Sequence, residues 1–571
     1  MRQRCVWQEY PANPELVREV CSRHGLPPLV ARLLVNRGLA ASADLDAYLS
    51  PELGRLHPPF GMADLDKATA RLVQALHQRE TLAIYGDYDA DGLTATALLH
   101  QFFKELGLAS ITYIPDRLTE GYGLNLPALK NLARRASLLV TVDCGVSDRE
   151  EVAWAQSHGL EVIVTDHHEL PPDLPPALAV VNPKRPGSDY PFEMLSGAGV
   201  AFLLAAGMRA ELRRTGWPRE LPEPHLGAYL DLVALGTAAD IVPVLGENRI
   251  LVRQGLKVME ETRRPGLVAL KEVAGLDGKP LSYQNLVFHL APRLNAAGRL
   301  GQAGGALELL LATDLQQARV QARLLNDLNR RRQLLEETVL TQATQMIRQQ
   351  GLDKRLVLVL AQEGWHPGVL GIAAARLVED YHRPVALISL KDNLGTGSAR
   401  SIEGFHLFQG LQTCRHLLSK FGGHEAAAGF RVAAQDIPAL YDQLEQAFAE
   451  QVGSFVPRPV LKVDAKVALS ELDEEFYHHL ERLRPFGPGN PEPVLVCQQV
   501  RCLNSWVVGE RHLKIQLAQG DCCREAVAFH QASCHPLTGL LDVAFSTRLS
   551  YFNGKLSPEL KILDWYRLTA R

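Results

Sequence analysis

The sequence has few of the signals that mark secreted, membrane or metal-finger proteins. Its nine cysteines are odd in number and form no C-x-x-C pair, which argues against a disulfide scaffold and against a zinc site of paired cysteines. The N-terminus MRQRCVWQEY has no apolar signal-peptide core. No apolar run reaches the roughly 18–20 residues that a membrane span needs. These absences predict a soluble, cytoplasmic protein without a membrane segment.

An excess of positive charge is also missing. The chain has 60 basic and 64 acidic residues, for a net charge of −4, so its overall charge does not indicate a nucleic-acid partner. A local basic groove is still compatible with this balance. The 571 residues are 46% apolar and 22% charged, which is typical of globular protein. At roughly 150 residues per domain, this length predicts three or four domains.

The first half of the chain is predicted to form an N-terminal helical segment, called the lead-in below, followed by an α/β domain. Residues 1–76 contain helix-spaced apolar positions, and residues 77–305 alternate short apolar runs with helical stretches. This alternation predicts β-α-β units and a parallel sheet, with strands buried on both faces. The expected strands are TLAIYG, ITYI, LLVTVD, LEVIVTD and LAVVN.

The second half predicts a bridging helix and two further domains. Apolar residues keep three-to-four spacing within 306–352, and Asp314 is a plausible N-terminal cap, so we expect one long helix there. A second α/β domain follows over 353–453. Residues 458–571 show short alternating runs with turn signals such as Asn553-Gly554, which favour a small β-barrel or sandwich.

Acidic residues crowd the end of the first expected strand. Asp87, Asp89 and Asp91 follow TLAIYG at alternate positions, just before Gly92. Like charges this close raise one another's pKa unless a cation neutralises them. A calcium loop would need a Glu six residues past the glycine, where the sequence has Leu98. A polar turn or a metal site of another kind therefore remains open at this stage.

Two further strands end in metal-binding side chains. LLVTVD ends in Asp143, and LEVIVTD ends in Asp166, followed by His167 and His168. Ligands of open α/β sheets bind at this carboxyl end of the strands. Carboxylates with imidazole and no thiolate suit Mn²⁺ or Mg²⁺. The clustering of these side chains suggests a two-metal site for phosphoester hydrolysis, and the sequence has no P-loop and no G-x-S-x-G motif that would compete with it.

The motifs together resemble the DHH phosphoesterase superfamily. DYDADG, VDCG and the Asp-His-His run occur in its order and spacing, and the likeness continues into the branch that contains single-strand-specific 5′→3′ DNA exonucleases. The resemblance implies a parallel-sheet DHH domain, a DHH-associated α/β domain joined to it by the long helix, and a C-terminal oligonucleotide-binding (OB) barrel. The further matching motifs are SGAGV (196–200), ALGTAADIVP (234–243), APRLNAAGRL (291–300), GSARS (397–401) and FGGHEAAAGF (421–430).

The resemblance also implies roles for individual residues at the catalytic centre. His168 would act on the scissile phosphate, and His424 of the GGH motif would approach it from the DHH-associated domain. Asp231 is an alternative to Asp240 for the fourth acidic motif, although we favour a solvated helix residue at position 231. The implied metal ligands are Asp87, Asp89, Asp91, Asp143, His167 and Asp240.

Substrate contacts are implied in the same way. Arg117, Ser398 and Arg400 would bind a 5′-phosphate, because a hydroxyl donor and guanidinium forks suit that group. Without the motif, each arginine would be read as a surface salt bridge. Arg293, Asn295 and Arg299, in an expected polar loop, would contact the DNA backbone. Aromatic candidates for base stacking in the last domain are Trp506, Phe529, Tyr551 and Phe552.

The expected function is a Mn²⁺- or Mg²⁺-dependent exonuclease, with two ions, that degrades single-stranded DNA to 5′-mononucleotides in recombination and repair. A RecQ-type helicase and single-strand-binding protein are partners that the resemblance suggests, and it favours a monomer. One alternative is a phosphodiesterase acting on short oligonucleotides or cyclic dinucleotides. A catalytically silent replisome scaffold is another, but such relatives have lost ligands that Asp143 and His167 retain here.

Overall fold

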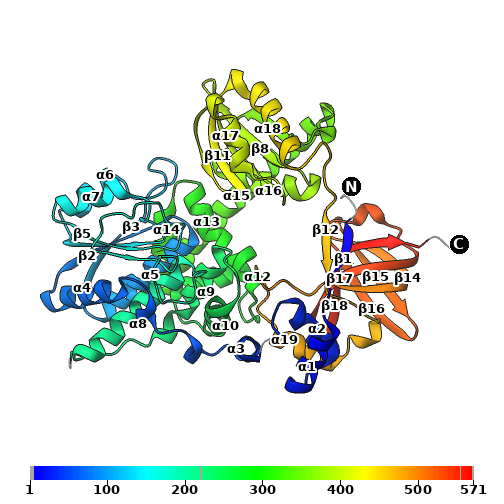
Figure 1. The fold of residues 1–571 in the computed structure, drawn as a ribbon, viewed down its shortest axis with the longest axis horizontal. Coiled ribbons are helices and arrows are strands. Elements are labelled where there is room, and N and C mark those ends of the chain that lie inside the picture. Colours follow the sequence, from blue (N-terminus) through cyan, green and yellow to red (C-terminus); the bar gives the residue numbers. More distant parts are fainter. Residues whose placement is uncertain (1–4, 41, 219–220, 553–554, 569–571) are drawn as a thin grey trace. The chain divides into compact units, whose positions relative to one another are not determined.

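The computed structural model describes residues 5–40, 42–218, 221–552 and 555–568. The chain forms two compact units (Figure 1). The amino-terminal unit contains residues 13–329 and 474–492, and the carboxy-terminal unit contains residues 1–12, 330–473 and 493–571. Each unit is described by itself below.

A five-stranded, wholly parallel sheet forms the centre of the amino-terminal unit. Its strand order is β3-β2-β4-β5-β6, and each expected apolar run forms one of the strands. The predicted parallel α/β domain is therefore confirmed. The strands are β2 (Thr81–Gly86), β3 (Ala109–Tyr113), β4 (Leu138–Val142), β5 (Glu161–Thr165) and β6 (Ala179–Val181).

Helices cover both faces of this sheet, because successive strand residues point to opposite sides. Leu82 and Ile84 of β2 pack in an apolar cluster with α4, α5, α8 and α9, while Ala83 and Tyr85 pack with α6 and α7 (Figure 1). The helices of this unit are α1 (Pro14–His24), α2 (Pro28–Asn36), α3 (Ser42–Leu49), α4 (Leu65–Gln78), α5 (Ala90–Glu105), α6 (Leu126–Leu132), α7 (Arg149–Ser157), α8 (Gly197–Thr215), α9 (Leu230–Ala239), α10 (Gly246–Glu260), α11 (Pro265–Ala274), α12 (Tyr283–Asn285), α13 (Ala291–Arg299), α14 (Ala303–Leu311) and α19 (Glu474–Arg482).

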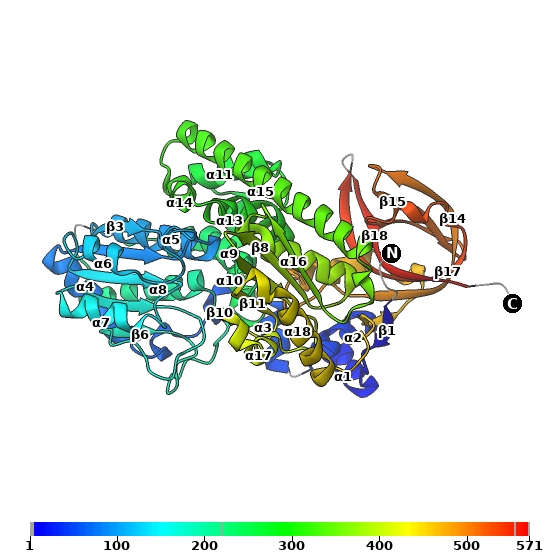
Figure 2. The ribbon, with the colours of Figure 1, turned by 90° about the horizontal axis from the view of Figure 1, so that it is seen from above.

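One 35-residue helix, α15 (Leu315–Gln349), leads from the first unit into the second (Figure 2). The Asp314 carboxylate accepts a hydrogen bond from the backbone N–H of Gln317 at 2.8 Å, as expected of an N-terminal cap. The helix begins later than residue 306, because residues 303–311 form the separate helix α14.

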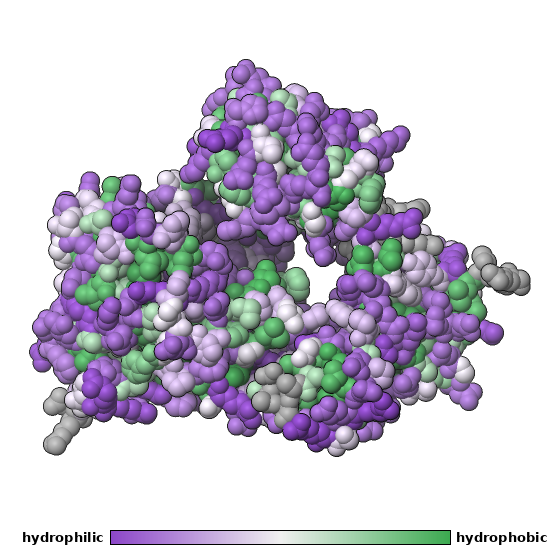
Figure 3. All heavy atoms as spheres, viewed as in Figure 1, coloured by the Kyte–Doolittle hydropathy of each residue, from purple (hydrophilic) through white to green (hydrophobic). Residues whose placement is uncertain are grey.

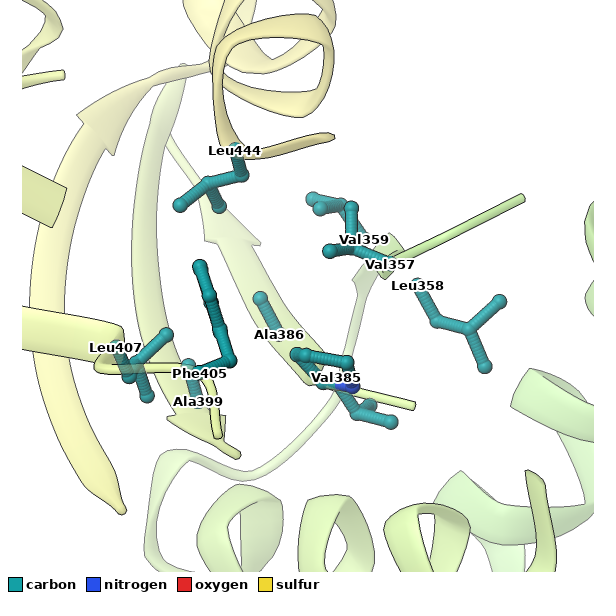
Figure 4. Close-up of a pocket in the computed structure, with 10 residues that line it drawn as sticks. Val357, Leu358, Val359, Val385, Ala386, Ala399, Phe405, Leu407 and Leu444 are labelled. Atoms are coloured by element: carbon teal, nitrogen blue, oxygen red, sulfur yellow. The ribbon is translucent and has the colours of Figure 1, made fainter. Parts of the chain in front are cut away.

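The carboxy-terminal unit contains a mixed sheet of order β10-β11-β9-β8-β7. Helices α15 and α16 cover one face of this sheet, and α17 and α18 cover the other. A small pocket on the second face is lined by apolar side chains such as Phe405 and Leu444 (Figure 4). The elements are β7 (Leu358–Glu363), α16 (Pro367–Tyr381), β8 (Val385–Lys391), β9 (Leu394–Arg400), α17 (Leu407–Thr413), β10 (Leu418–Gly423), β11 (Ala427–Ala433) and α18 (Ile437–Gln451).

The same unit holds a closed five-stranded β-barrel. Its strands pair in the order β14-β15-β16-β18-β17, and β17 pairs back with β14 to close it. The predicted OB-like barrel is thus confirmed. The strands of this region are β12 (Val460–Val463), β13 (Ala465–Lys466), β14 (Leu495–Val508), β15 (His512–Gln519), β16 (Cys522–Ala528), β17 (Gly539–Phe552) and β18 (Lys555–Arg567).

The N-terminus contains a strand that the sequence did not reveal. β1 (Val6–Glu9) pairs in parallel with β12, so the first residues belong to the unit that holds the barrel. Helices dominate the rest of the lead-in. Among the residues described, no helix is both long and apolar enough to cross a membrane. The face seen in Figure 3 is mostly hydrophilic, with apolar residues in small groups.

Candidate metal centre

The acidic run after β2 is fixed by a close contact with the start of α5. Asp87 is 5% exposed, and its backbone N–H donates to the carbonyl of Val142 at 3.3 Å. A Cβ atom at position 92 would lie 2.6–2.8 Å from the Asp87 backbone, so only glycine fits there. Gly92 therefore allows the turn that places the carboxylates at the end of the strand.

Asp89 and Asp91 occupy the N-terminus of α5. Asp89 caps this helix, and its Oδ1 accepts hydrogen bonds from the N–H groups of Asp91 (2.9 Å) and Gly92 (3.1 Å). Asp91 is fully buried and accepts from the N–H groups of Gly197 (2.6 Å) and Ala198 (2.9 Å) at the start of α8. The SGAGV motif thus holds the Asp91 carboxylate in place.

Asp143 and His167 meet at the tips of β4 and β5. Nε2 of His167 lies 3.0 Å from Oδ1 of Asp143 and 3.5 Å from Oδ2 of Asp240. The first pair is close but not aligned for a hydrogen bond, so both atoms are buried without a hydrogen-bond partner, as is Oδ1 of Asp87. Buried polar atoms are rarely left unpaired in a protein. This arrangement has the chemistry of a cation site.

His168 is held by Asp166, a strand-tip residue that was not among the expected metal ligands. Nδ1 of His168 lies 2.7 Å from Oδ1 of Asp166, which is fully buried and also accepts from the N–H groups of residues 167 and 168. The hydroxyl of Tyr122 lies 3.2 Å from the same Nδ1. Asn182, also buried, donates to the carbonyl of His168 at 3.0 Å. Asp166, Tyr122 and Asn182 therefore orient His168.

Of the two candidates for the fourth acidic position, only Asp240 lies in the cluster. Asp231 is 1% exposed, and its carboxylate accepts from Arg264 at 3.1 Å and from Thr262 at 2.7 Å. The favoured interpretation of Asp231 as a solvated helix residue is wrong. It lies on the opposite end of α9 from Asp240, where Arg264 neutralises its buried charge.

Burial and like charge set the pKa values of the cluster. Burial is the largest cause that raises the pKa of Asp87, followed by the nearby charge of Asp89. Burial is also the largest cause that raises the pKa of Asp143, followed by the charge of Asp91. Burial, followed in size by the charge of Asp89, raises the pKa of Asp240 to about 7. Such raised pKa values mean that the carboxylates repel one another in the absence of a cation.

The surroundings shift the pKa values of the two histidines in opposite directions. Burial lowers the pKa of His167 to about 4, so its ring is neutral and can serve as a ligand. Burial opposes the charge of His168 as well, but the hydrogen bond to Asp166 outweighs it and raises the pKa of His168 to about 9. His167 therefore has the character of a ligand, and His168 that of a cationic hydrogen-bond donor.

Three overlapping groups of side chains could hold metal ions. In each group the ligand atoms lie within 4.8 Å of one another. Carboxylate oxygens and a neutral imidazole, without a thiolate, suit Mn²⁺ and Mg²⁺. The groups are Asp143–His167–His168, Asp91–His167–Asp240 and Asp87–Asp89–Asp143.

The residues expected to touch DNA from the amino-terminal unit have mixed surroundings. Arg117 is exposed, with its guanidinium 5.2 Å from the ring centre of Tyr88. Arg293, Asn295 and Arg299 were expected in a loop, and that was wrong, because they lie on helix α13 after a π-helical segment over 286–290. A proline at position 292 concealed the helix, although proline is tolerated in a first turn.

Arg293 and Asn295 form hydrogen bonds within the fold. Nε of Arg293 donates to Asn326 of α15 at 3.2 Å, and Oδ1 of Asn295 accepts from the N–H of Ala90 at 2.7 Å. Asn295 thus supports the start of α5, next to the acidic run. A Cβ at Gly298 would meet the carbonyl of Tyr88 at 2.7 Å, so α13 packs tightly against the same loop.

The remaining candidates belong to the carboxy-terminal unit. Ser398 and Arg400 lie on β9 and are half-buried, and His424 is exposed in the turn between β10 and β11. Trp506 and Phe529 are on or beside the barrel, with Lys514 5.6 Å from the Trp506 ring centre and His512 packed on Phe529. The side chains of Tyr551 and Phe552 lie outside the described part of the chain.

One rule would have found the missed polar residues of the site. Asp87, Asp143, Asp166 and Asn182 each follow the last residue of a parallel strand, β2, β4, β5 or β6 respectively. Applying that rule to the fifth expected run, LAVVN, would have added Asn182. No comparable signal marks Tyr122, because its loop reaches the site only through tertiary contacts.

The fold and the acidic centre define a DHH-type phosphoesterase domain. The DHH family N-terminal domain matches residues 81–237, the DHHA1 domain matches 353–450, and the RecJ OB domain matches 463–564. The single-stranded-DNA-specific exonuclease RecJ of Salmonella typhimurium is 37% identical over 95% of this chain and 96% of its own length. The RecJ of Bacillus subtilis is 36% identical over 98% of this chain and 70% of its own length. The chain belongs to the RecJ family.

Solved structures agree with this assignment. RecJ of Thermus thermophilus in complex with Mn²⁺ has a TM-score of 0.84 and 33% identity, covering 100% of this chain and 81% of its own. The Mg²⁺ complex of the same protein has a TM-score of 0.77 and 31% identity, covering 99% of this chain and 79% of its own.

Proposed function

We propose that this chain is a divalent-metal-dependent exonuclease that degrades single-stranded DNA from the 5′ end to 5′-mononucleotides, in DNA recombination and repair. The observation that carries this proposal is the set of unpartnered ligand atoms on Asp87, Asp143 and His167, where three strand tips meet. Relatives of the same family, similar over nearly the whole chain, are named as single-stranded-DNA-specific exonucleases.

The metal ligands in this proposal are six residues around those atoms. Asp143 and His167 each belong to two of the candidate groups; the two oxygens of Asp143 could contribute to both ions, whereas His167 would bind a single ion through Nε2. When bound, Mn²⁺ or Mg²⁺ would neutralise charge on the scissile phosphate and activate the attacking water. The complete proposed set is Asp87, Asp89, Asp91, Asp143, His167 and Asp240.

His168 acts on the substrate rather than as a primary ligand in this proposal. Because Nδ1 of His168 is engaged with Asp166, Nε2 is the nitrogen left to donate to a phosphate oxygen. A donor fixed in this way stabilises charge that develops on the phosphate without reorganising during the reaction. His424 would contribute a second imidazole to the scissile phosphate.

End recognition is proposed to depend on Arg117, Ser398 and Arg400. A guanidinium can bind a phosphate through two parallel hydrogen bonds, and a serine hydroxyl adds a third donor. Binding a terminal phosphate would fix the polarity of degradation. Along the strand, Arg293, Asn295 and Arg299 would contact the DNA backbone.

The proposal also includes the cellular context of the protein. All nine cysteines are free thiols in the structure, which supports a reducing compartment such as the cytoplasm. A monomer that works with a RecQ-type helicase and a single-strand-binding protein follows from the family resemblance alone.

The direct test is degradation of single-stranded DNA labelled at either end, in the presence of Mn²⁺, with a blunt duplex alongside. We expect immediate release of labelled mononucleotide from the 5′ label only, with the duplex spared and all activity lost on chelation. Release from the 3′ label first would contradict the polarity. Turnover of dinucleotides without degradation of long strands would contradict the exonuclease.

A further inference from the structure

Helix α16 packs against the strand that carries Ser398 and Arg400. In the β8–β9 ladder, Ser398 pairs with Leu387 and Arg400 with Val385, and paired residues point to the same face of a sheet. Leu387 and Val385 lie in the apolar cluster with α16. The intervening Ala399 faces the opposite side, towards Phe405 (Figure 4). Ser398 and Arg400 therefore face α16.

Gly371, in the second turn of α16, lies directly against both side chains. A Cβ atom at position 371 would be 2.8 Å from Nη2 of Arg400 and 3.1 Å from Oγ of Ser398. The first distance is shorter than a real Cβ contact, and the second is tighter than most. Any larger residue at position 371 must therefore displace the guanidinium, the hydroxyl or both.

The backbone gives no reason for glycine at this position. Gly371 is not among the residues with positive φ, so alanine could adopt its conformation. Glycine in a helix interior is less favourable than alanine. Glycine at position 371 therefore makes the helix less stable, but it leaves room for Arg400 and Ser398.

We propose that Gly371 is a positioning residue that keeps the phosphate-binding atoms of Arg400 and Ser398 in place, and so determines the preference for 5′-phosphorylated ends. This inference rests on the proposed function, in which these two side chains bind the terminal phosphate. The nearby bond from Nη1 of Arg400 to the carbonyl of Ala399, at 2.8 Å, fixes the guanidinium plane that a Cβ would disturb.

The test compares the full-length wild type with Gly371→Ala on two single strands that differ only in a 5′-phosphate or a 5′-hydroxyl. We expect the ratio of kcat/KM for the two ends to fall by about tenfold or more, as for a weakened bond to a charged group. The thermal midpoint should stay the same or rise. Gly54→Ala is the matched control, because a Cβ there has nothing within 4 Å.

A double-mutant cycle distinguishes action through Arg400 from a general effect. In an Arg400→Ala background, which has already lost discrimination, Gly371→Ala should change the ratio no further. Unchanged discrimination in Gly371→Ala, or an equal loss for both ends with a lowered thermal midpoint, would overturn the inference alone. A wild type that degrades single strands without discriminating between the ends would overturn the phosphate assignment and, with it, this inference.

Discussion

At the scale of single residues, the carboxylates at the strand tips carry charge that the surrounding chain does not neutralise. Asp87 and Asp143 are buried, their pKa values are raised, and each has an oxygen without a partner. The catalytic centre is therefore also a source of instability until a cation binds. The carboxylates that are needed for activity should therefore lower the stability of the metal-free protein.

Asp143→Asn tests this relation. We expect hydrolysis to fall by roughly three orders of magnitude, since several kcal/mol of charge stabilisation at the phosphate are lost. The metal-free variant should unfold at the same temperature as the wild type or higher, and Mn²⁺ should no longer raise its thermal midpoint. Asp442→Asn, at an exposed carboxylate, is the control. Full activity in Asp143→Asn would exclude it as a metal ligand.

Asp166→Asn tests the orientation of His168. The amide lacks the negative charge that holds Nδ1 at 2.7 Å and raises the pKa of His168, so we expect kcat/KM to fall about 10–100-fold. Mn²⁺ should still raise the thermal midpoint, because the six proposed ligands are intact. An activity equal to that of the wild type would mean that Asp166 serves the fold only.

At the scale of elements, α9 positions two carboxylates with different surroundings, the buried Asp231 and the half-buried Asp240. Asp240 follows its C-terminal end and lies in the proposed metal centre, whereas Asp231 in its first turn pairs with Arg264, which precedes α11. Their nine-residue separation places them at opposite ends of one helix. Both residues are aspartates, so the sequence gives them the same chemistry, and only the packing distinguishes their roles.

Asp231→Ala should destabilise the protein without removing the metal site. Removing one partner of a buried ion pair leaves Arg264 uncompensated and costs about 3–5 kcal/mol. The thermal midpoint should fall, but the upward shift on adding Mn²⁺ should remain. Loss of the shift in a folded Asp231→Ala variant would instead assign this residue to the metal centre.

At the scale of the whole molecule, the chain returns to its first unit after forming part of the second. Residues 474–492 belong with residues 13–329. Arg249, 1% exposed, donates to the carbonyls of Leu483 and Arg482, both at 3.0 Å, and lies 3.8 Å from the ring centre of Tyr48. Asn490 accepts from the hydroxyl of Tyr48 at 2.9 Å. This late segment is thus part of the core of the amino-terminal unit.

Two truncations test that contribution. A chain ending at residue 473 lacks the carbonyls of Leu483 and Arg482 to which Arg249 donates, whereas a chain ending at 492 keeps them, and both chains lack the barrel. We expect the thermal midpoint of the shorter chain to be lower by about 5 °C or more. Equal midpoints would show that residues 474–492 do not stabilise the amino-terminal unit.

Local patterns in the sequence were enough for the parallel sheet, the long helix, the barrel and the acidic strand tips. Strand periodicity and the rule that ligands bind at the carboxyl ends of parallel strands act within a few residues. They placed Asp87, Asp143 and His167 at one edge of the sheet. The roles of the phosphate-binding and DNA-binding residues came from the family resemblance and remain predictions.

The tertiary structure alone decided which polar residues are buried together. It separated Asp231 from Asp240, placed Asp166 behind His168, turned the expected loop around Arg293 into a helix, and brought Gly371 against Arg400. Each of these depends on contacts between segments distant in the sequence, or on the exact packing of neighbours. The residue type fixes what a side chain can do, and the fold determines the partner with which it does it.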